Sequence, residues 1–273
     1  MSTKPDTDLS YWNSQFQFTR LLPHFADHVA RMGERSADVT LPFERIDHGD
    51  DPRQFVQVTG SPAPGTVLPV FIHGGYWRAL EAERHRFLMP TLAGIAGAAA
   101  NLEYRLLPHV TLAEIIADTL AGLNALIERY EVRLLIVGHS AGGPLAVTAA
   151  PARGGKVVGA VGISGLYDLT PLQWSFLREE VGLTAGDLVG HSPQENWQGH
   201  DAGHIVVAVG AEETPEFHRQ AQMFASSHGA RVLTVDGAHH MNVLDALAQP
   251  DGVLARAVAE IYRGAGGSPA PHR

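Results

Sequence analysis

The segment Gly138-His139-Ser140-Ala141-Gly142 constrains the fold of this chain more than any other stretch of its sequence. It directly follows the apolar run at residues 134–137, which is typical of a short buried strand, and it precedes small residues at 144–150, which favour a helix. A serine flanked by glycines between a strand and a helix occupies a sharp turn that lifts its hydroxyl above the sheet. The segment therefore predicts that Ser140 is a nucleophile, and the alternative is a serine that only caps the helix.

Short apolar runs alternate with helical patterns along the rest of the chain. Several of these runs are apolar without interruption, as in strands that helices cover on both faces. Helix starts are indicated by a capping-box sequence at residues 111–114 and by Thr214-Pro215, and a further helix is expected at residues 23–31. The pattern predicts an α/β fold with a mostly parallel eight-stranded sheet and helices on both faces. The expected strands cover residues 43–46, 54–58, 67–72, 98–103, 134–137, 157–163, 205–209 and 232–235.

The domain organisation is predicted to be simple. Residues 1–263 are expected to form a single domain, and residues 264–273, rich in glycine and proline, a disordered tail. Residues 170–200 lack a clean strand pattern but contain two tryptophans. We interpret them as an excursion over the carboxyl edge of the sheet, where such folds bind ligands, and the alternative is a long loop that serves only packing.

Composition excludes several classes of partner and site. The net charge of −9 over 273 residues argues against nucleic-acid binding. No stretch approaches the ~18 to 20 apolar residues of a membrane span, and the N-terminal residues lack the apolar core of a secretory signal. The absence of cysteine excludes disulfides and thiolate metal sites and favours a cytoplasmic location. Neither a phosphate-binding loop nor a metal-ligand spacing of His and Asp is present, so no cofactor and no metal are expected.

A serine nucleophile needs hydrogen-bond donors for the oxygen that becomes negatively charged during acyl transfer. The sequence His73-Gly74-Gly75-Tyr76-Trp77 directly follows the expected strand at residues 67–72. Paired glycines at the end of a strand allow bare backbone N–H groups to approach a ligand closely. We therefore predict an oxyanion hole formed by the N–H groups of Gly74, Gly75 and Ala141, and the alternative is an ordinary tight turn.

The nucleophile also needs a base, and the base needs a carboxylate to orient it. In this kind of fold the acid and the histidine follow the serine in that order. Glu212 and Glu213 come after the expected strand at residues 205–209, and Glu213 is preferred because it immediately precedes the helix start. The other glutamate is then a surface charge near a helix N-terminus. His239 and His240 follow the last strand, and His240 is preferred as the base.

With these segments in hand, the chain resembles the α/β-hydrolase superfamily and, within it, the kynurenine formamidase (arylformamidase) group. The resemblance covers about residues 43–247. Residues 73–77 resemble the oxyanion motif H-G-G-x-W of that group, residues 138–142 its nucleophile elbow, and residues 213–220 the block that opens with its catalytic acid. Residues 103–108 and 164–169 resemble intervening segments. Glu213 departs from the pattern, because the group usually carries aspartate at this position.

The resemblance implies hydrolysis of an aryl formamide such as N-formylkynurenine through a formyl-enzyme. Tyr76 and Trp77 would then border the acyl pocket, and the alternative for them is packing against the sheet. A small-acyl carboxylesterase would use the same residues, and a non-catalytic binding protein of this fold would need none of them. The partner expected is a small-molecule acyl substrate, and a homodimer is compatible with the sequence.

Overall fold

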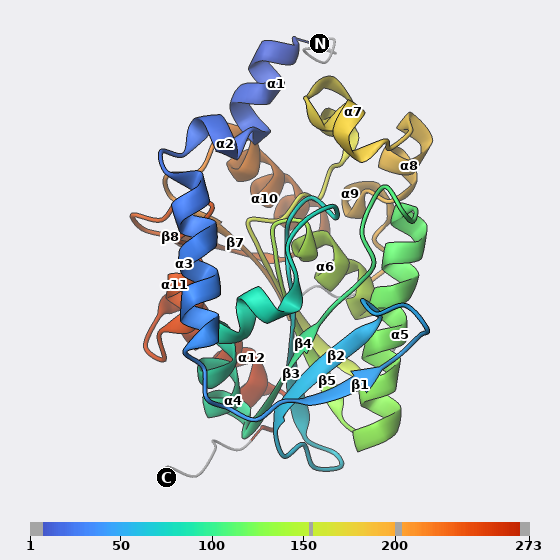
Figure 1. The fold of residues 1–273 in the computed structure, drawn as a ribbon, viewed down its shortest axis with the longest axis vertical. Helices are drawn as coiled ribbons and strands as arrows, with labels where there is room; N and C mark the ends of the chain where they lie inside the picture. Colours follow the sequence, from blue (N-terminus) through green and yellow to red (C-terminus); the bar gives the residue numbers. More distant parts are fainter. Residues whose placement is uncertain (1–7, 153–154, 200–203, 268–273) are drawn as a thin grey trace.

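The computed structural model describes residues 8–152, 155–199 and 204–267, and an eight-stranded sheet runs through their centre (Figure 1). The strand order is β1-β2-β4-β3-β5-β6-β7-β8, in which β2 pairs antiparallel with both β1 and β4 and all pairs from β4 to β8 are parallel. The predicted α/β fold and all eight predicted strands are confirmed. The strands are β1 (Glu44–Asp47), β2 (Phe55–Gly60), β3 (Val67–Ile72), β4 (Ala98–Leu102), β5 (Arg133–His139), β6 (Val157–Ile163), β7 (Ile205–Gly210) and β8 (Arg231–Val235).

Helices lie on both faces of the sheet, as the sequence predicts (Figure 1). One face is covered by α5, α6 and α10, and the other by α3, α4, α11 and α12. The helices are α1 (Leu9–Phe16), α2 (Phe18–Leu21), α3 (Phe25–Ala37), α4 (Met89–Ala96), α5 (Leu112–Tyr130), α6 (Gly142–Ala152), α7 (Leu177–Val181), α8 (Ala185–Gly190), α9 (Pro193–Asn196), α10 (Pro215–His228), α11 (Asp245–Ala248) and α12 (Val253–Gly264), with 3-10 helices η1 (Ala82–Leu88) and η2 (Thr170–Trp174).

The uninterrupted apolar strands are explained by the two cores that they separate. Along β3, Leu68 and Val70 face the core under α5, α6 and α10, whereas Val67 and Phe71 face the core under α4 and α12. Successive side chains of a strand point to opposite faces, so a strand that is covered on both sides must be apolar at every position. Because both faces of the central strands are closed in this way, their carboxyl ends are the part of the sheet at which a ligand site can form.

The predicted helix starts are confirmed in position, but one differs in its contacts. Thr111 and Glu114 form the complete capping box at the start of α5. Thr214 occupies the N-cap position of α10, yet its side chain makes no capping bond and its hydroxyl donates instead to the backbone oxygen of Gln15 (3.0 Å). The start of α10 therefore anchors the N-terminal helix α1. Within the described residues, no helix is both long and apolar enough to span a bilayer.

The excursion between β6 and β7 contains η2, α7, α8 and α9, and α7 lies at the same end of the molecule as α1 (Figure 1). The backbone N–H of Phe176 donates to the side chain of Asn13 (2.7 Å), and the rings of Trp174 and Trp12 lie 5.9 Å apart. The ring of Phe176 also meets the ring of Tyr76 edge-on at 6.3 Å. The excursion thus packs on α1 and reaches the loop that follows β3.

The first residues of the segment expected to be a disordered tail, residues 264–267, are described by the structure. Gly264 is the last residue of α12, and the N–H of Gly267 donates to the carbonyl oxygen of Tyr262 (3.0 Å). Residues 268–273 of the expected disordered tail lie outside the described residues.

Candidate active site

Ser140 stands between the end of β5 and the start of α6, as the glycine-flanked segment predicts. Its φ angle of +53° lies in the left-handed region, which a non-glycine residue adopts only when its surroundings hold it there. Its N–H donates to Ile163 of β6 (2.8 Å) and its carbonyl accepts from Gly143 (2.9 Å). A Cβ atom on Gly142 would lie 2.2 Å from the carbonyl oxygen of Ile72, so only glycine allows α6 to start this close to β3.

The structure brings Ser140, His240 and Glu213 together in one chain of hydrogen bonds. Oγ of Ser140 lies 3.0 Å from Nε2 of His240, and Nδ1 of His240 lies 2.7 Å from Oε2 of Glu213. A carboxylate accepts only, so Nδ1 carries the hydrogen and Nε2 is left as the acceptor for the serine hydroxyl. The arrangement can transfer the Ser140 proton to His240 while the carboxylate stabilises the resulting imidazolium.

The two rival residues do not join this chain. Glu212 follows β7 with its side chain exposed, and its N–H donates to the carbonyl of Ala238 (2.9 Å). His239 is half-buried, and its Nδ1 accepts from the N–H of Met241 (3.2 Å). Burial and the neighbouring His28 lower the pKa of His239. The positions preferred from the sequence, Glu213 and His240, are therefore those that the fold places beside Ser140.

His139, which directly precedes Ser140, contacts the backbone of His240. It is buried, and its Nε2–H donates to the backbone oxygen of His240 (3.0 Å). Burial, followed by the nearby His240, lowers the pKa of His139 well below its usual value, so the ring stays neutral. The hydrogen bond fixes the backbone from which the His240 side chain projects.

Ser164 holds the second oxygen of the Glu213 carboxylate and was not found from the sequence. Its hydroxyl donates to Oε1 of Glu213, which also accepts from the N–H of Gly210 (2.9 Å). Ser164 directly follows β6, with a φ of +50°, and its own N–H donates to Ala208 (2.7 Å). The available signal was a serine at the carboxyl end of a strand next to β5, which is the edge where such sheets gather their functional groups.

Substitution of Ser164 by alanine is expected to lower kcat by about 10- to 100-fold and leave KM nearly unchanged, because a hydrogen bond to a charged group contributes about 1.5 to 3 kcal/mol. Without this hydroxyl, Glu213 is held less firmly against His240. Steady-state kinetics would measure the change, with Ser226→Ala on the exposed side of α10 as the control. A Ser164→Ala protein with the kcat of the unmodified enzyme would show that this hydroxyl is unimportant for positioning Glu213.

The loop after β3 brings the predicted oxyanion donors next to Ser140. A Cβ atom on Gly74 would lie 2.8 Å from Cβ of Ser140 and 2.9 Å from the carbonyl oxygen of His139, so the Gly74 backbone packs directly against the serine segment. Gly75 has a φ of +106°. Within the described part of the chain, the N–H groups of Gly74, Gly75 and Ala141 donate no hydrogen bond. These three donors are therefore unpaired in a segment that touches the serine, which suits them to a developing oxyanion.

Tyr76 and Trp77 differ in their surroundings. The Tyr76 hydroxyl donates to the carbonyl of Phe16 (2.8 Å), and its ring stacks with Phe18 at 6.2 Å. Trp77 is buried in the core and lines a small cavity with residues that include Leu145. Its indole nitrogen has no hydrogen-bond partner among the residues that the structure describes. Tyr76 thus contacts Phe16 and Phe18, whereas Trp77 packs in the core.

Aromatic side chains pack against His240 and cover the candidate site. The Phe18 ring lies parallel to the His240 ring, with centroids 3.9 Å apart and an interplanar angle of 12°, and Phe217 of α10 meets both rings, at 5.6 and 4.8 Å. We call Phe16, Phe18 and Phe217 the aromatic cover. Ser140 and His240 are each only 4 % exposed. Little of either residue is therefore open to solvent beneath these rings.

Among the described residues, no group of three His, Asp or Glu side chains is arranged to hold a metal ion.

Comparison with known proteins agrees with the fold. A family profile described as alpha/beta hydrolase fold matches residues 69–188, which include most of β3, Ser140 and the excursion as far as α8.

Individual known proteins are also similar to this chain along most of its length. It is 22% identical to a kynurenine formamidase of Danio rerio, over 93% of this chain and 94% of that protein. Among solved structures, a candidate thioesterase from Silicibacter sp. TM1040 superposes with a TM-score of 0.82 at 26% identity, covering 93% of this chain and 98% of its own. An esterase from Pyrobaculum calidifontis superposes with a TM-score of 0.65 at 18% identity, covering 97% and 94% of the two chains, and shows the fold alone. These matches and the observed sheet show that the chain has the alpha/beta hydrolase fold and is similar to the kynurenine formamidases.

Proposed function

We propose that the protein is a serine hydrolase that transfers a small acyl group from its substrate to water. The observation that carries this proposal is the hydrogen-bonded chain from Oγ of Ser140 through His240 to Glu213. A binding protein of this fold would have no use for a nucleophile, a base and an acid in line. The family profile and the relatives support hydrolysis as the class of reaction.

In the proposed mechanism, His240 accepts the hydroxyl proton while Oγ of Ser140 attacks the carbonyl carbon of the substrate. The carbonyl oxygen becomes negatively charged and is stabilised by the N–H groups of Gly74, Gly75 and Ala141. His240 then gives the proton to the leaving amine or alcohol. A water molecule, activated by the same histidine, hydrolyses the acyl-enzyme and restores Ser140.

The substrate class that we favour is an aryl formamide such as N-formylkynurenine. One observation supports it beside the similarity to a kynurenine formamidase. Phe18 and Phe217 lie beside the His240 ring and Tyr76 stacks on Phe18, so the surroundings of the nucleophile are aromatic and suit an aryl substrate. A small-acyl ester is the second candidate, because ester and formamide hydrolysis share the tetrahedral intermediate and solved esterases share the fold.

A substrate panel separates these candidates. We expect kcat/KM for N-formylkynurenine to exceed the values for p-nitrophenyl acetate and butyrate by about 10-fold or more, because each added methylene in a tight acyl site typically costs that much. The rates would be followed by absorbance at one pH and temperature, with the uncatalysed rate of each compound subtracted. A large preference for either ester would reject the formamidase assignment in favour of the esterase.

A further inference from the structure

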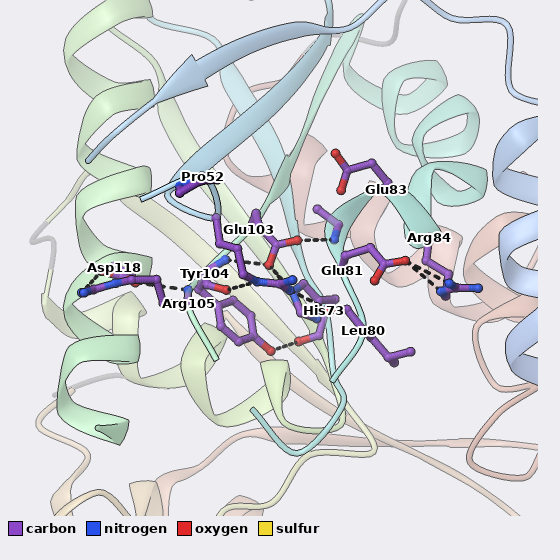
Figure 2. Close-up of polar contacts among 12 residues, drawn as sticks. Pro52, His73, Leu80, Glu81, Glu83, Arg84, Glu103, Tyr104, Arg105 and Asp118 are labelled. Carbon is purple, nitrogen blue, oxygen red and sulfur yellow. Dashed lines mark hydrogen bonds and ion pairs between the residues drawn. The ribbon is translucent and has the colours of Figure 1, made fainter. Parts of the chain in front are cut away.

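A buried polar cluster adjoins the oxyanion loop and takes no direct part in the proposed chemistry. It consists of His73, Glu103, Tyr104 and Arg53, of which the first three are at most 1 % exposed. Figure 2 shows His73 between the Glu103 carboxylate and the Tyr104 ring, with the Tyr104 hydroxyl directed at the His73 carbonyl oxygen. His73 and Tyr104 also stack, with ring centroids 4.3 Å apart.

Both ring nitrogens of His73 face acceptors. Nδ1 lies 2.7 Å from the carbonyl oxygen of Gly74, which can only accept. Nε2 lies 3.1 Å from Oε1 of Glu103. That oxygen already accepts from Arg53 Nη2 (2.7 Å) and from the N–H of Tyr104 (3.0 Å), and Oε2 accepts from the N–H of Ala82 (2.7 Å). A carboxylate that receives these three donors carries no hydrogen, so both nitrogens of His73 must supply one.

We propose that His73 is a buried imidazolium, paired with Glu103, which positions the N–H groups of Gly74 and Gly75 as oxyanion donors. This inference rests on the proposed function, since it assigns a role in the same acyl-transfer site. His73 is a positioning residue, because its ring is fully buried and both of its nitrogens are engaged by the Gly74 carbonyl and the Glu103 carboxylate.

Hydrogen bonds to the carbonyl groups of His73 and Gly74 set the directions of the N–H groups of Gly74 and Gly75. Within one planar trans peptide unit the C=O and N–H bonds point in opposite directions. The Tyr104 hydroxyl donates to the carbonyl of His73 (2.9 Å), which fixes the direction of the Gly74 N–H. Nδ1 of His73 donates to the carbonyl of Gly74, which fixes the direction of the Gly75 N–H. Each proposed oxyanion donor is thus held through its own peptide plane.

The charges of the cluster favour the same role. Arg53 and His73 are positive and Glu103 is negative, so the cluster carries one net positive charge close to the site where negative charge develops. Burial raises the pKa of Glu103, but the charge and hydrogen bond of His73 and the charge of Arg53 outweigh it, and the net pKa is lowered. Burial and then the charge of His73 lower the pKa of the stacked His85 to about 3, so His85 remains neutral.

The first test reads the protonation of His73 directly. In the full-length protein labelled with ¹⁵N-histidine, both ring nitrogens of His73 are expected to show the shifts of protonated nitrogen at pH 7, with the signals assigned by their loss in His73→Gln. In Glu103→Gln the ring is expected to lose one hydrogen. A neutral His73 in the unmodified protein would overturn the proposal, and this measurement does not depend on any hydrolytic activity.

The second test is kinetic. Loss of a whole oxyanion donor lowers kcat by about 10²- to 10³-fold, so misdirecting one donor in Glu103→Gln is expected to lower kcat by about 10- to 100-fold with KM changed less than about twofold. Tyr104→Phe keeps the ring stack on His73 but removes the hydroxyl, and a similar loss of kcat is expected there while His73 stays doubly protonated. Glu81→Gln is the matched control, since Glu81 pairs with Arg84 in the same region (Figure 2).

The outcomes separate this inference from the proposed function. If Glu103→Gln and Tyr104→Phe both keep the kcat of the Glu81→Gln control, the positioning role is wrong, whereas the serine mechanism stands. If Ser140→Ala retains activity, the serine mechanism is wrong, whatever the state of His73. Should Glu103→Gln fail to fold, Tyr104→Phe and the spectrum of the unmodified protein still decide the question.

Discussion

Replacing Ser140 by alanine is expected to lower kcat by about 10⁴- to 10⁶-fold, because the nucleophile is lost while the oxyanion donors and the binding surface remain. The fold should survive, since the Ser140 backbone keeps its hydrogen bonds to Ile163 and Gly143. Turnover of N-formylkynurenine would be measured under single-turnover and steady-state conditions, and far-UV circular dichroism would confirm the fold. The remaining rate should still exceed that of a preparation lacking the protein, by about 10³- to 10⁴-fold, because the oxyanion donors and the binding surface are kept.

A covalent label provides an independent check on the same residue. A small serine-directed phosphonate is expected to add one equivalent to the unmodified protein and none to Ser140→Ala, as read by intact mass. Ser226→Ala should label like the unmodified protein, since Ser226 lies on the exposed side of α10. An adduct on Ser140→Ala, or turnover near the original kcat, would contradict Ser140 as the nucleophile.

The central strands of the sheet were predictable from the sequence because they are apolar on both faces. The bounds of β3 and β6 coincide with those of two apolar runs in the sequence. Strands that are buried between two layers of helices are apolar on both faces, so such runs mark them. Ser140, Glu213 and His240 were also within reach of sequence reasoning. Each directly follows a strand or lies in the loop after one, and the carboxyl ends of parallel strands meet at one edge.

Other parts of the site depend on contacts that leave no local pattern. Phe18 stacks on His240 although the two lie at opposite ends of the chain, and nothing around Phe18 differs from an ordinary amphipathic stretch. Ser164 was overlooked because a serine after a strand is common. The cluster around His73 was missed for a related reason. Its partners Arg53 and Glu103 lie on separate segments that only the pairing of β2 with β4 and of β4 with β3 brings together.

The glutamate at position 213, where the related group usually has aspartate, is accommodated by its surroundings. Oε1 is held by the Ser164 hydroxyl and by the N–H of Gly210, and Oε2 is thereby directed at Nδ1 of His240. Each oxygen thus has a fixed set of donors, and the longer side chain is as firmly placed as a shorter one would be. This arrangement also makes the effect of a substitution at Glu213 unusually easy to derive.

Glu213→Gln is expected to lower kcat by about 10⁴-fold, the loss typical when the acid of a triad becomes an amide. The amide oxygen would take the place of Oε1, because Ser164 and Gly210 both donate there. The NH₂ group would then face Nδ1 of His240 and donate to it. Nδ1 becomes an acceptor, the ring hydrogen moves to Nε2, and the Ser140 hydroxyl loses the base that should take its proton.

The adjacent Glu212→Gln is the matched control and should retain kcat within about twofold, since exposed substitutions away from the site have small effects. Glu213→Asp should recover a large part of the activity that Glu213→Gln loses, because it restores a carboxylate while giving up one methylene of reach. Steady-state kcat for the three variants would decide between the two glutamates. If Glu212→Gln proved the more damaging change, the acid would be Glu212, and the observed contact between Glu213 and His240 would have no catalytic role.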